Sequence, residues 1–236
     1  LTGKIADFHF APTVTSESNL LSEGIVSESI VVTGNTVIDS LLWTINKIDG
    51  SYTNLAIESL RTTVDFTKRV ILVTAHRREN LGEGIINICR SILAIAEEHD
   101  VEVIFPVHLN PNVKKPVHEL LGNTPNIHLT EPLDYPSFVW VMKSAYLILS
   151  DSGGIQEEAP SLGIPVLVMR DTTERPEAAE AGTIKLVGTD YTKIVNTVTE
   201  LLENDEEYSK MSKSANPYGT GESCEKIIDF IKEIKR

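Results

Sequence analysis

The stretch RVILVTAHRRENLGEGIINICRSILAIAEEHDVEVIFPV, residues 69–107, indicates the fold class of this chain. It begins with a continuous apolar run at 69–75 and ends with another at 101–107. Between them, residues 83–100 have the apolar periodicity of a helix that buries one face. The isoleucines on that face are Ile85, Ile88, Ile92 and Ile95. Continuous apolar runs are typical of strands buried on both sides of a parallel sheet, so a strand–helix–strand unit is predicted.

The same alternation of apolar runs and amphipathic segments continues to residue 214. Further strands are predicted at 126–130, 145–150, 165–169 and 183–188. Further helices are predicted near 112–121 and 134–144, after Gly154, and near 190–203 and 205–214. Pro160 must end or kink the helix after Gly154. This alternation predicts an α/β fold, a Rossmann-like parallel sheet covered by helices on both faces.

The residues before 69 follow a different pattern. Strand-like segments at 5–12 and 29–34 are each followed by a helical one, near 15–23 and 35–48. Two strands and two helices bury too little surface to form a stable domain alone. Because the chain also begins at Leu1, within this pattern, we expect a fragment that carries the last units of an earlier domain.

Composition excludes several classes of function. The chain has 236 residues and a formal charge of −13, from 21 Lys and Arg against 34 Asp and Glu, so its surface should repel nucleic acid. No apolar stretch reaches the 18 or so residues of a membrane-spanning helix. Cys89 and Cys224 match no metal or redox spacing and suit a reducing cytoplasm. Patterns typical of metal sites, serine nucleophiles, dinucleotide folds and P-loops are missing: CxxC, HExxH, GxSxG, GxGxxG and the Walker loop.

Polar clusters follow five of the predicted strands. The carboxyl ends of parallel strands meet at one edge of a sheet, and ligands bind outside that edge. The clusters are AHRREN (75–80), HLNP (108–111), EPLDYP (131–136), DSGG (151–154) and RDTTERPE (170–177). Together they predict a binding site at this edge.

The DSGG cluster suits an anionic ligand. Gly153 and Gly154 leave room beside the first backbone N–H groups of a helix, which favour phosphate. The Ser152 hydroxyl could cap the helix or donate to a ligand oxygen. Glu157 or Glu158, one turn further, could accept hydrogen bonds from vicinal hydroxyls such as those of ribose. The alternative is a capped helix with solvent-facing glutamates.

The HRREN cluster concentrates positive charge in an acidic protein. Arg77 and Arg78 could bind diphosphate oxygens through their guanidinium groups, and His76 could transfer a proton. The alternative is a loop in which Glu79 neutralises an arginine. His108 also has two interpretations: it could contact the bound molecule, but a lone histidine is more often a hydrogen-bonded loop residue.

Two further clusters leave alternatives open. Phe138 and Tyr135 could stack on a base, although an aromatic residue in an amphipathic helix usually belongs to the core. Arg175 could bind phosphate, or it could pair with Glu174 or Glu177.

Four segments, HRREN, PVHLNP, LSDSGGIQEEAPSLGIPVLVMRDTTERPEA and NPYG, resemble the non-hydrolysing UDP-N-acetylglucosamine 2-epimerases. The resemblance runs from about residue 1 to 236 and is most specific over 148–180. It implies a GT-B-type architecture of two Rossmann-like domains facing a cleft. The parts implied are a remnant of the N-terminal domain (1–48), a connector (49–68), the C-terminal nucleotide-binding domain (69–214) and a helix crossing back (215–236).

The resemblance also implies roles for individual residues. In bacterial members, Arg77 and His108 would match contacts to a second, regulatory UDP-GlcNAc. The remaining matches are Ser152, Gly153 and Gly154 for the diphosphate, Glu158 for the ribose hydroxyls, Phe138 near the uracil, Arg175 in the cleft and His76 in the active site.

The implied reaction removes the C2 proton of UDP-GlcNAc, eliminates UDP, and adds UDP back to give UDP-ManNAc, with no metal or redox cofactor. The family's acid–base carboxylates lie mainly in the N-terminal domain, so this chain is expected to bind UDP but to be inactive alone. A cytoplasmic homodimer is implied for the full-length protein. The alternatives are a UDP-sugar-binding module without catalysis, a hydrolysing 2-epimerase and a GT-B glycosyltransferase.

Overall fold

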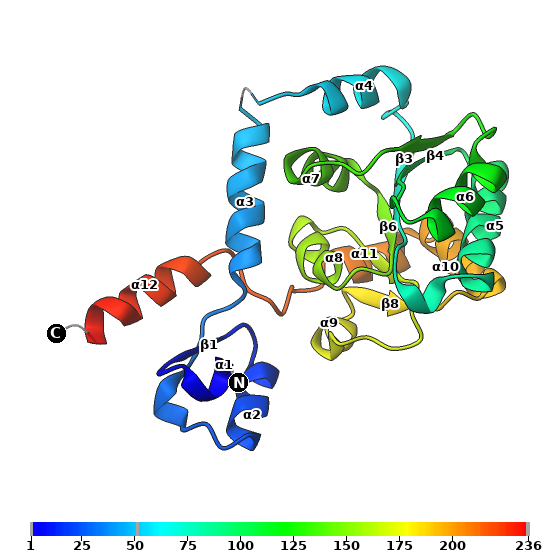
Figure 1. Ribbon diagram of the computed structural model, residues 1–236. Coiled ribbons are helices and arrows are strands. Elements are labelled where there is room, and N and C mark those ends of the chain that lie inside the picture. Colours follow the sequence, from blue (N-terminus) through cyan, green and yellow to red (C-terminus); the bar gives the residue numbers. More distant parts are fainter. Residues whose placement is uncertain (1, 51, 235–236) are drawn as a thin grey trace.

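The computed structural model describes residues 2–50 and 52–234, and its main feature is a six-stranded parallel sheet (Figure 1). The strands lie in the order β5-β4-β3-β6-β7-β8. The first strand of this sheet, β3, is therefore central, β4 and β5 follow outward on one side, and β6, β7 and β8 follow outward on the other. This is the Rossmann order, and its switch point lies between β3 and β6. The strands are β3 (Arg69–Thr74), β4 (Val101–Pro106), β5 (Ile127–Thr130), β6 (Leu147–Ser150), β7 (Val166–Val168) and β8 (Ile184–Leu186). The predicted α/β class and these six strands are confirmed.

Helices cover both faces of this sheet, as predicted. Alternate residues of β3 point to opposite layers: Ile71 and Val73 pack with one helical layer, and Val70 and Leu72 with the other. The first layer contains α5 (Glu83–Glu98), α6 (Pro111–Leu121) and α10 (Tyr191–Glu203), and the second α7 (Tyr135–Ser144) and α8 (Gly153–Glu158). The predicted buried face of α5 is confirmed, since Ile85, Ile88, Ile92 and Ile95 are each at most 2% exposed. The other helices here are α4 (Leu55–Thr63), α9 (Pro176–Glu180) and α11 (Asp205–Ser212).

The first part of the chain forms a separate two-stranded parallel sheet. The two strands of this sheet are β1 (His9–Ala11) and β2 (Ile30–Val32). The helices of this part of the chain are α1 (Thr2–Ile5), α2 (Val14–Ser22) and α3 (Thr36–Ile48). The strand predicted over 5–12 is too long, because helix α1 occupies its start and only three residues pair with β2. Ile38 and Leu41 of α3 are fully buried in the core beneath the larger sheet.

The last helix, α12 (Ser223–Ile234), returns to the first part of the chain (Figure 1). Its Phe230 ring packs edge-on against Phe8 and Phe10, with centroids 5.2 and 5.6 Å away. Asp39 of α3 accepts the backbone N–H of Cys224 at 2.9 Å. The domain boundaries drawn from the sequence stay predictions, and Leu1, residue 51 and residues 235–236 lie outside the described part. In that part, no helix is both long and apolar enough to cross a membrane.

Candidate active site

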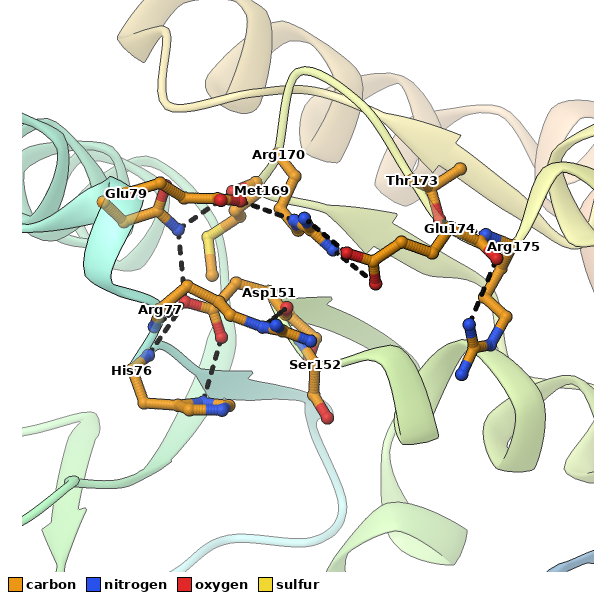
Figure 2. Close-up of polar contacts among 12 residues, drawn as sticks. His76, Arg77, Glu79, Asp151, Ser152, Met169, Arg170, Thr173, Glu174 and Arg175 are labelled. Carbon is orange, nitrogen blue, oxygen red and sulfur yellow. Dashed lines mark hydrogen bonds and ion pairs between the residues drawn. The ribbon is translucent and has the colours of Figure 1, made fainter. Parts of the chain in front are cut away.

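Asp151 joins the two loops that flank the switch point of the sheet (Figure 2). It follows β6 directly, and its side chain is fully buried. Its Oδ2 accepts the backbone N–H groups of His76 and Arg77, each at 2.8 Å, from the loop after β3. The Asn80 amide donates to the same oxygen at 3.1 Å and to the Met169 carbonyl, after β7, at 3.0 Å. The loops after three neighbouring strands are therefore held together by one carboxylate and one amide.

The His76 ring contacts the same carboxylate. Its Nδ1 lies 3.1 Å from Oδ1 of Asp151, and its ring stacks on that of His108 with centroids 5.7 Å apart. Asp151 raises the pKa of His76, against the opposing effects of burial and of Arg77. Burial favours the neutral form of Asp151, but the donors from His76 and Arg77 outweigh it and hold the pKa of Asp151 below its usual range. An oriented imidazole beside an ionised carboxylate is suited to proton transfer.

A pocket of about 300 Å³ opens beside His76. Its walls come from the loops after β3, β4, β5 and β6, so four of the five predicted polar loops meet in it. Aromatic side chains on α7 provide flat apolar surface of the kind that a base can stack on. The lining residues are Thr74, Ala75, His76, Pro106, His108, Pro132, Leu133, Tyr135, Phe138, Ser152, Gly154, Ile155 and Glu158.

The two glutamates of α8 face different surroundings. Glu158 lines the pocket and accepts a hydrogen bond from the Tyr135 hydroxyl at 3.1 Å. Burial raises the pKa of Glu158 to about 7; the Tyr135 donor opposes this rise, and the neighbouring charge of Glu157 adds to it. Glu157 is buried away from the pocket, where it pairs with Arg175 and accepts the Asn35 amide at 2.8 Å. Of the two glutamates, Glu158 is therefore the one that lines the pocket.

Two guanidinium groups meet beside the start of α8. A Cβ at Gly153 would lie 3.7 Å from the nearest guanidinium nitrogen of both Arg77 and Arg175. Arg77 is held there by a hydrogen bond from its Nε to the Asp151 carbonyl, at 3.2 Å. Ser152 occupies the N-cap position, but its hydroxyl does not cap α8. Two positive charges, the N–H groups that begin α8 and the Ser152 hydroxyl therefore lie around one glycine.

The carboxylates expected to neutralise these arginines are used elsewhere. Glu79 pairs with the buried Arg170 at 2.5 Å, and Glu174 pairs with Arg170 at 3.2 Å (Figure 2). Arg175 takes Glu157 as its carboxylate partner, in place of Glu174 or Glu177. The Arg77 guanidinium pairs with no carboxylate in the part of the chain that the structure describes, which leaves its charge available to an anion.

Six of the predicted site residues line the pocket: His76, His108, Phe138, Ser152, Gly154 and Glu158. The other three, Arg77, Gly153 and Arg175, do not line it but meet one another at the start of α8. Sequence reasoning missed three others: Asp151, Asn80 and Glu157 as a link to Asn35. A signal existed for Asp151, because an aspartate directly after a continuous apolar run is placed where burial demands several donors. Within 2–50 and 52–234, no cluster of three or more His, Cys, Asp or Glu side chains could hold a metal ion.

A family model described as UDP-N-acetylglucosamine 2-epimerase matches residues 1–232. The chain belongs to this epimerase family. It is 52% identical over 234 residues to the UDP-N-acetylglucosamine 2-epimerase of Escherichia coli O157:H7, covering 98% of this chain and 62% of that protein. The epimerase relative from Campylobacter jejuni is 50% identical over 236 residues, with the same two coverages. The chain thus spans about three fifths of the length of these relatives.

Solved structures of epimerases agree with this assignment. The Neisseria meningitidis UDP-GlcNAc 2-epimerase bound to UDP-GlcNAc superposes with a TM-score of 0.91 at 49% identity, over 98% of this chain and 63% of that one. The S. aureus MnaA–UDP co-structure gives 0.88 at 44% identity, over 98% and 58%. The wall teichoic acid polymerase TagF, at 14% identity and a TM-score of 0.58, shares the fold alone. The epimerase family is therefore established by sequence and by structure.

Proposed function

We propose that this chain binds the UDP portion of UDP-N-acetylglucosamine and contributes to its interconversion with UDP-N-acetylmannosamine. The observation that supports this most is the meeting of Arg77 and Arg175 beside Gly153, in a protein of formal charge −13. Such a local concentration of positive charge suits a diphosphate, because guanidinium groups pair with phosphate oxygens in bidentate fashion. The relatives solved with UDP-GlcNAc or UDP support the same ligand.

The proposed ligand would extend across the pocket from the arginines. Ser152, Gly153 and Gly154 would contact the diphosphate through the hydroxyl and the N–H groups that begin α8. Glu158 would accept hydrogen bonds from the ribose hydroxyls. Phe138 lines the same pocket, and its ring would lie near the uracil.

The proposed reaction breaks two bonds and later remakes them. The C2 proton is removed and the C1–O bond to UDP breaks, which gives a glycal; a proton and UDP then add back with C2 inverted. Arg77, Arg175 and the α8 N–H groups would stabilise the charge that develops on the departing diphosphate. His76 would act as an acid–base group at the edge of the site.

We propose that the chain depends on further residues for most of the proton transfer. Among the described residues that line the pocket, Glu158 is the single carboxylate, and it is assigned to the ribose. A weakly acidic C2–H needs a positioned base on one face and an acid for return of the proton. A cytoplasmic homodimer and a regulatory contact of Arg77 and His108 with a second nucleotide stay predictions.

Proton NMR of UDP-GlcNAc in D₂O tests the proposal. We expect the chain alone to bind the nucleotide without exchanging the C2 proton. A chimera that joins it to the part of the Escherichia coli relative outside the match should introduce deuterium at C2 and form UDP-ManNAc. Free ManNAc and UDP would instead identify a hydrolysing enzyme, and binding without exchange in both samples would identify a binding module. C2 exchange by the chain alone would contradict the proposed division of roles.

A further inference from the structure

The contact with Asp151 occupies one of the two ring nitrogens of His76. Nδ1 of His76 lies 3.1 Å from Oδ1 of Asp151 in an ion-pair contact, and that buried oxygen has no hydrogen-bond partner in the described part of the chain, so Nδ1–H of His76 is the donor nearest to it. The second oxygen, Oδ2, accepts three N–H donors, from His76, Arg77 and Asn80. Three donors on one oxygen keep the carboxylate ionised, so Oδ1 has a lone pair to offer and no proton.

We propose that Asp151 is a positioning residue that fixes the Nδ1–H tautomer of His76, so that His76 exchanges protons with the ligand through Nε2 alone. The Nε2–H tautomer would place the Nδ1 lone pair against the Oδ1 lone pair and leave a buried carboxylate oxygen without a donor. Such a loss is strongly unfavourable in a buried site. The hydrogen bond made by one imidazole nitrogen thereby determines the state of the other.

Asn80 keeps the carboxylate in the orientation that this contact needs. Its side chain is buried, and its amide nitrogen donates both to Oδ2 of Asp151 at 3.1 Å and to the Met169 carbonyl at 3.0 Å. Because both amide hydrogens are used, Asn80 is itself fixed between the loops after β6 and β7. Rotation of the Asp151 carboxylate would break this bond together with the two backbone bonds to Oδ2.

The ring of His76 faces the proposed ligand from this anchored position. His76 and Ser152 line the same pocket, and Figure 2 shows both side chains extending to the same side of the loop that carries Asp151. The identity of the ligand rests on the proposed function, whereas the tautomer does not. When Nε2 accepts a proton, the imidazolium keeps Nδ1–H on Asp151, and the same Nε2 proton is the one returned. No net proton is gained or lost over the cycle.

Long-range ¹H–¹⁵N NMR of the chain labelled at histidine nitrogen tests the inference. The His76 signals are assigned by their loss in His76→Gln. In the unsubstituted chain, at a pH where the ring is neutral, we expect the Nδ1–H tautomer, and added UDP should perturb Nε2 more than Nδ1. An Nε2–H tautomer of His76, or a mixture of the two tautomers in comparable amounts, would overturn the inference.

Asp151→Asn provides the second arm. Its carboxamide oxygen can still accept the three donors, and its NH₂ would then face Nδ1 of His76, so we expect the ring to switch to Nε2–H. An unchanged tautomer in a folded Asp151→Asn chain would also overturn the inference. Glu102→Gln is the matched control, because Glu102 contacts His128 at 2.5 Å in a pair whose residues do not line this pocket, and it should leave the His76 signals unchanged. UDP affinity in the same samples tests the proposed function separately.

Discussion

Glu157 and Glu158 are adjacent in the chain, yet the first links α8 to Arg175 and Asn35 while the second faces the pocket. Asn35 is the N-cap residue of α3, so Glu157 connects the first part of the chain to an arginine of the proposed diphosphate site. One carboxylate therefore supports the structure around the site, and its neighbour is free to contact a ligand. The two should respond differently to the same substitution.

Glu157→Gln should lower the free energy of unfolding. The change removes a largely buried charge that pairs with Arg175, and such losses cost on the order of 1–3 kcal/mol. Urea denaturation at pH 7 measures it. Glu200→Gln is the matched control, since Glu200 pairs with Lys185 on the surface and an exposed pair contributes about 1 kcal/mol or less. Equal effects of the two substitutions would contradict the role assigned to Glu157.

Glu158→Gln should change how stability depends on pH. Burial raises the pKa of Glu158 from 4.5 to about 7. The protonated Glu158 side chain therefore contributes to the free energy of unfolding fully at pH values below its pKa in the unfolded chain, and this contribution is lost as pH rises through about 7. Glutamine stays neutral, so the variant should gain stability relative to the unsubstituted chain between about pH 5 and pH 8, by on the order of 1–3 kcal/mol. His76 titrates in both proteins, so its contribution to the pH dependence cancels when the two stability curves are subtracted. Parallel stability curves over this range would rule out the raised pKa.

Gly153→Ala should weaken UDP binding without harming the fold. The new methyl group would contact the guanidinium groups of Arg77 and Arg175 at 3.7 Å, an ordinary packing distance, while it fills the space where a phosphate would lie. We expect a loss of UDP affinity of about tenfold or more, close to 1.4 kcal/mol, with thermal stability nearly unchanged. Uridine, which has no phosphate, should bind both proteins equally. A matching loss for uridine would place the effect outside the diphosphate site.

Arg175→Gln should lower both UDP affinity and the free energy of unfolding, because it also leaves the buried Glu157 without its partner, whereas Arg170→Gln should lower the free energy of unfolding alone. Arg175 reaches the proposed diphosphate site, so its loss should lower UDP affinity by about tenfold or more. Arg170 is buried between Glu79 and Glu174, so its loss should lower the free energy of unfolding and change UDP affinity by less than about threefold. Titration calorimetry and denaturation of both variants check the pair. The reverse pattern would show that the roles of the two arginines are exchanged.

The strands and their polar loops could be predicted because their signals are local. Continuous apolar runs at 69–75 and 101–107 depend only on burial on both faces of a sheet. The rule that parallel strands end at one edge of a sheet then predicts a common site for His76, His108 and Ser152 without knowledge of their side-chain contacts. The first strand was predicted too long, since at 5–12 the pairing partner β2 is three residues long and sets the limit.

The partners of the charged side chains could not be predicted. Glu79 lies next to Arg78 in sequence but pairs with Arg170, because the loops after β3 and β7 approach one another only in the folded sheet. Arg175 likewise bonds Glu157 on another element in preference to the carboxylates of its own motif. Which carboxylate pairs with which arginine depends on distances in the folded structure, and composition and periodicity carry no information about these distances.

Calorimetric titration of UDP into the chain and into Glu158→Ala tests most directly whether the pocket at the β3–β6 switch point holds the nucleotide. We expect saturable binding at one site per chain, weakened by about tenfold or more in Glu158→Ala, with the circular dichroism spectrum unchanged. A folded chain with no saturable UDP binding, or a folded Glu158→Ala variant with unchanged affinity, would contradict this placement of the nucleotide.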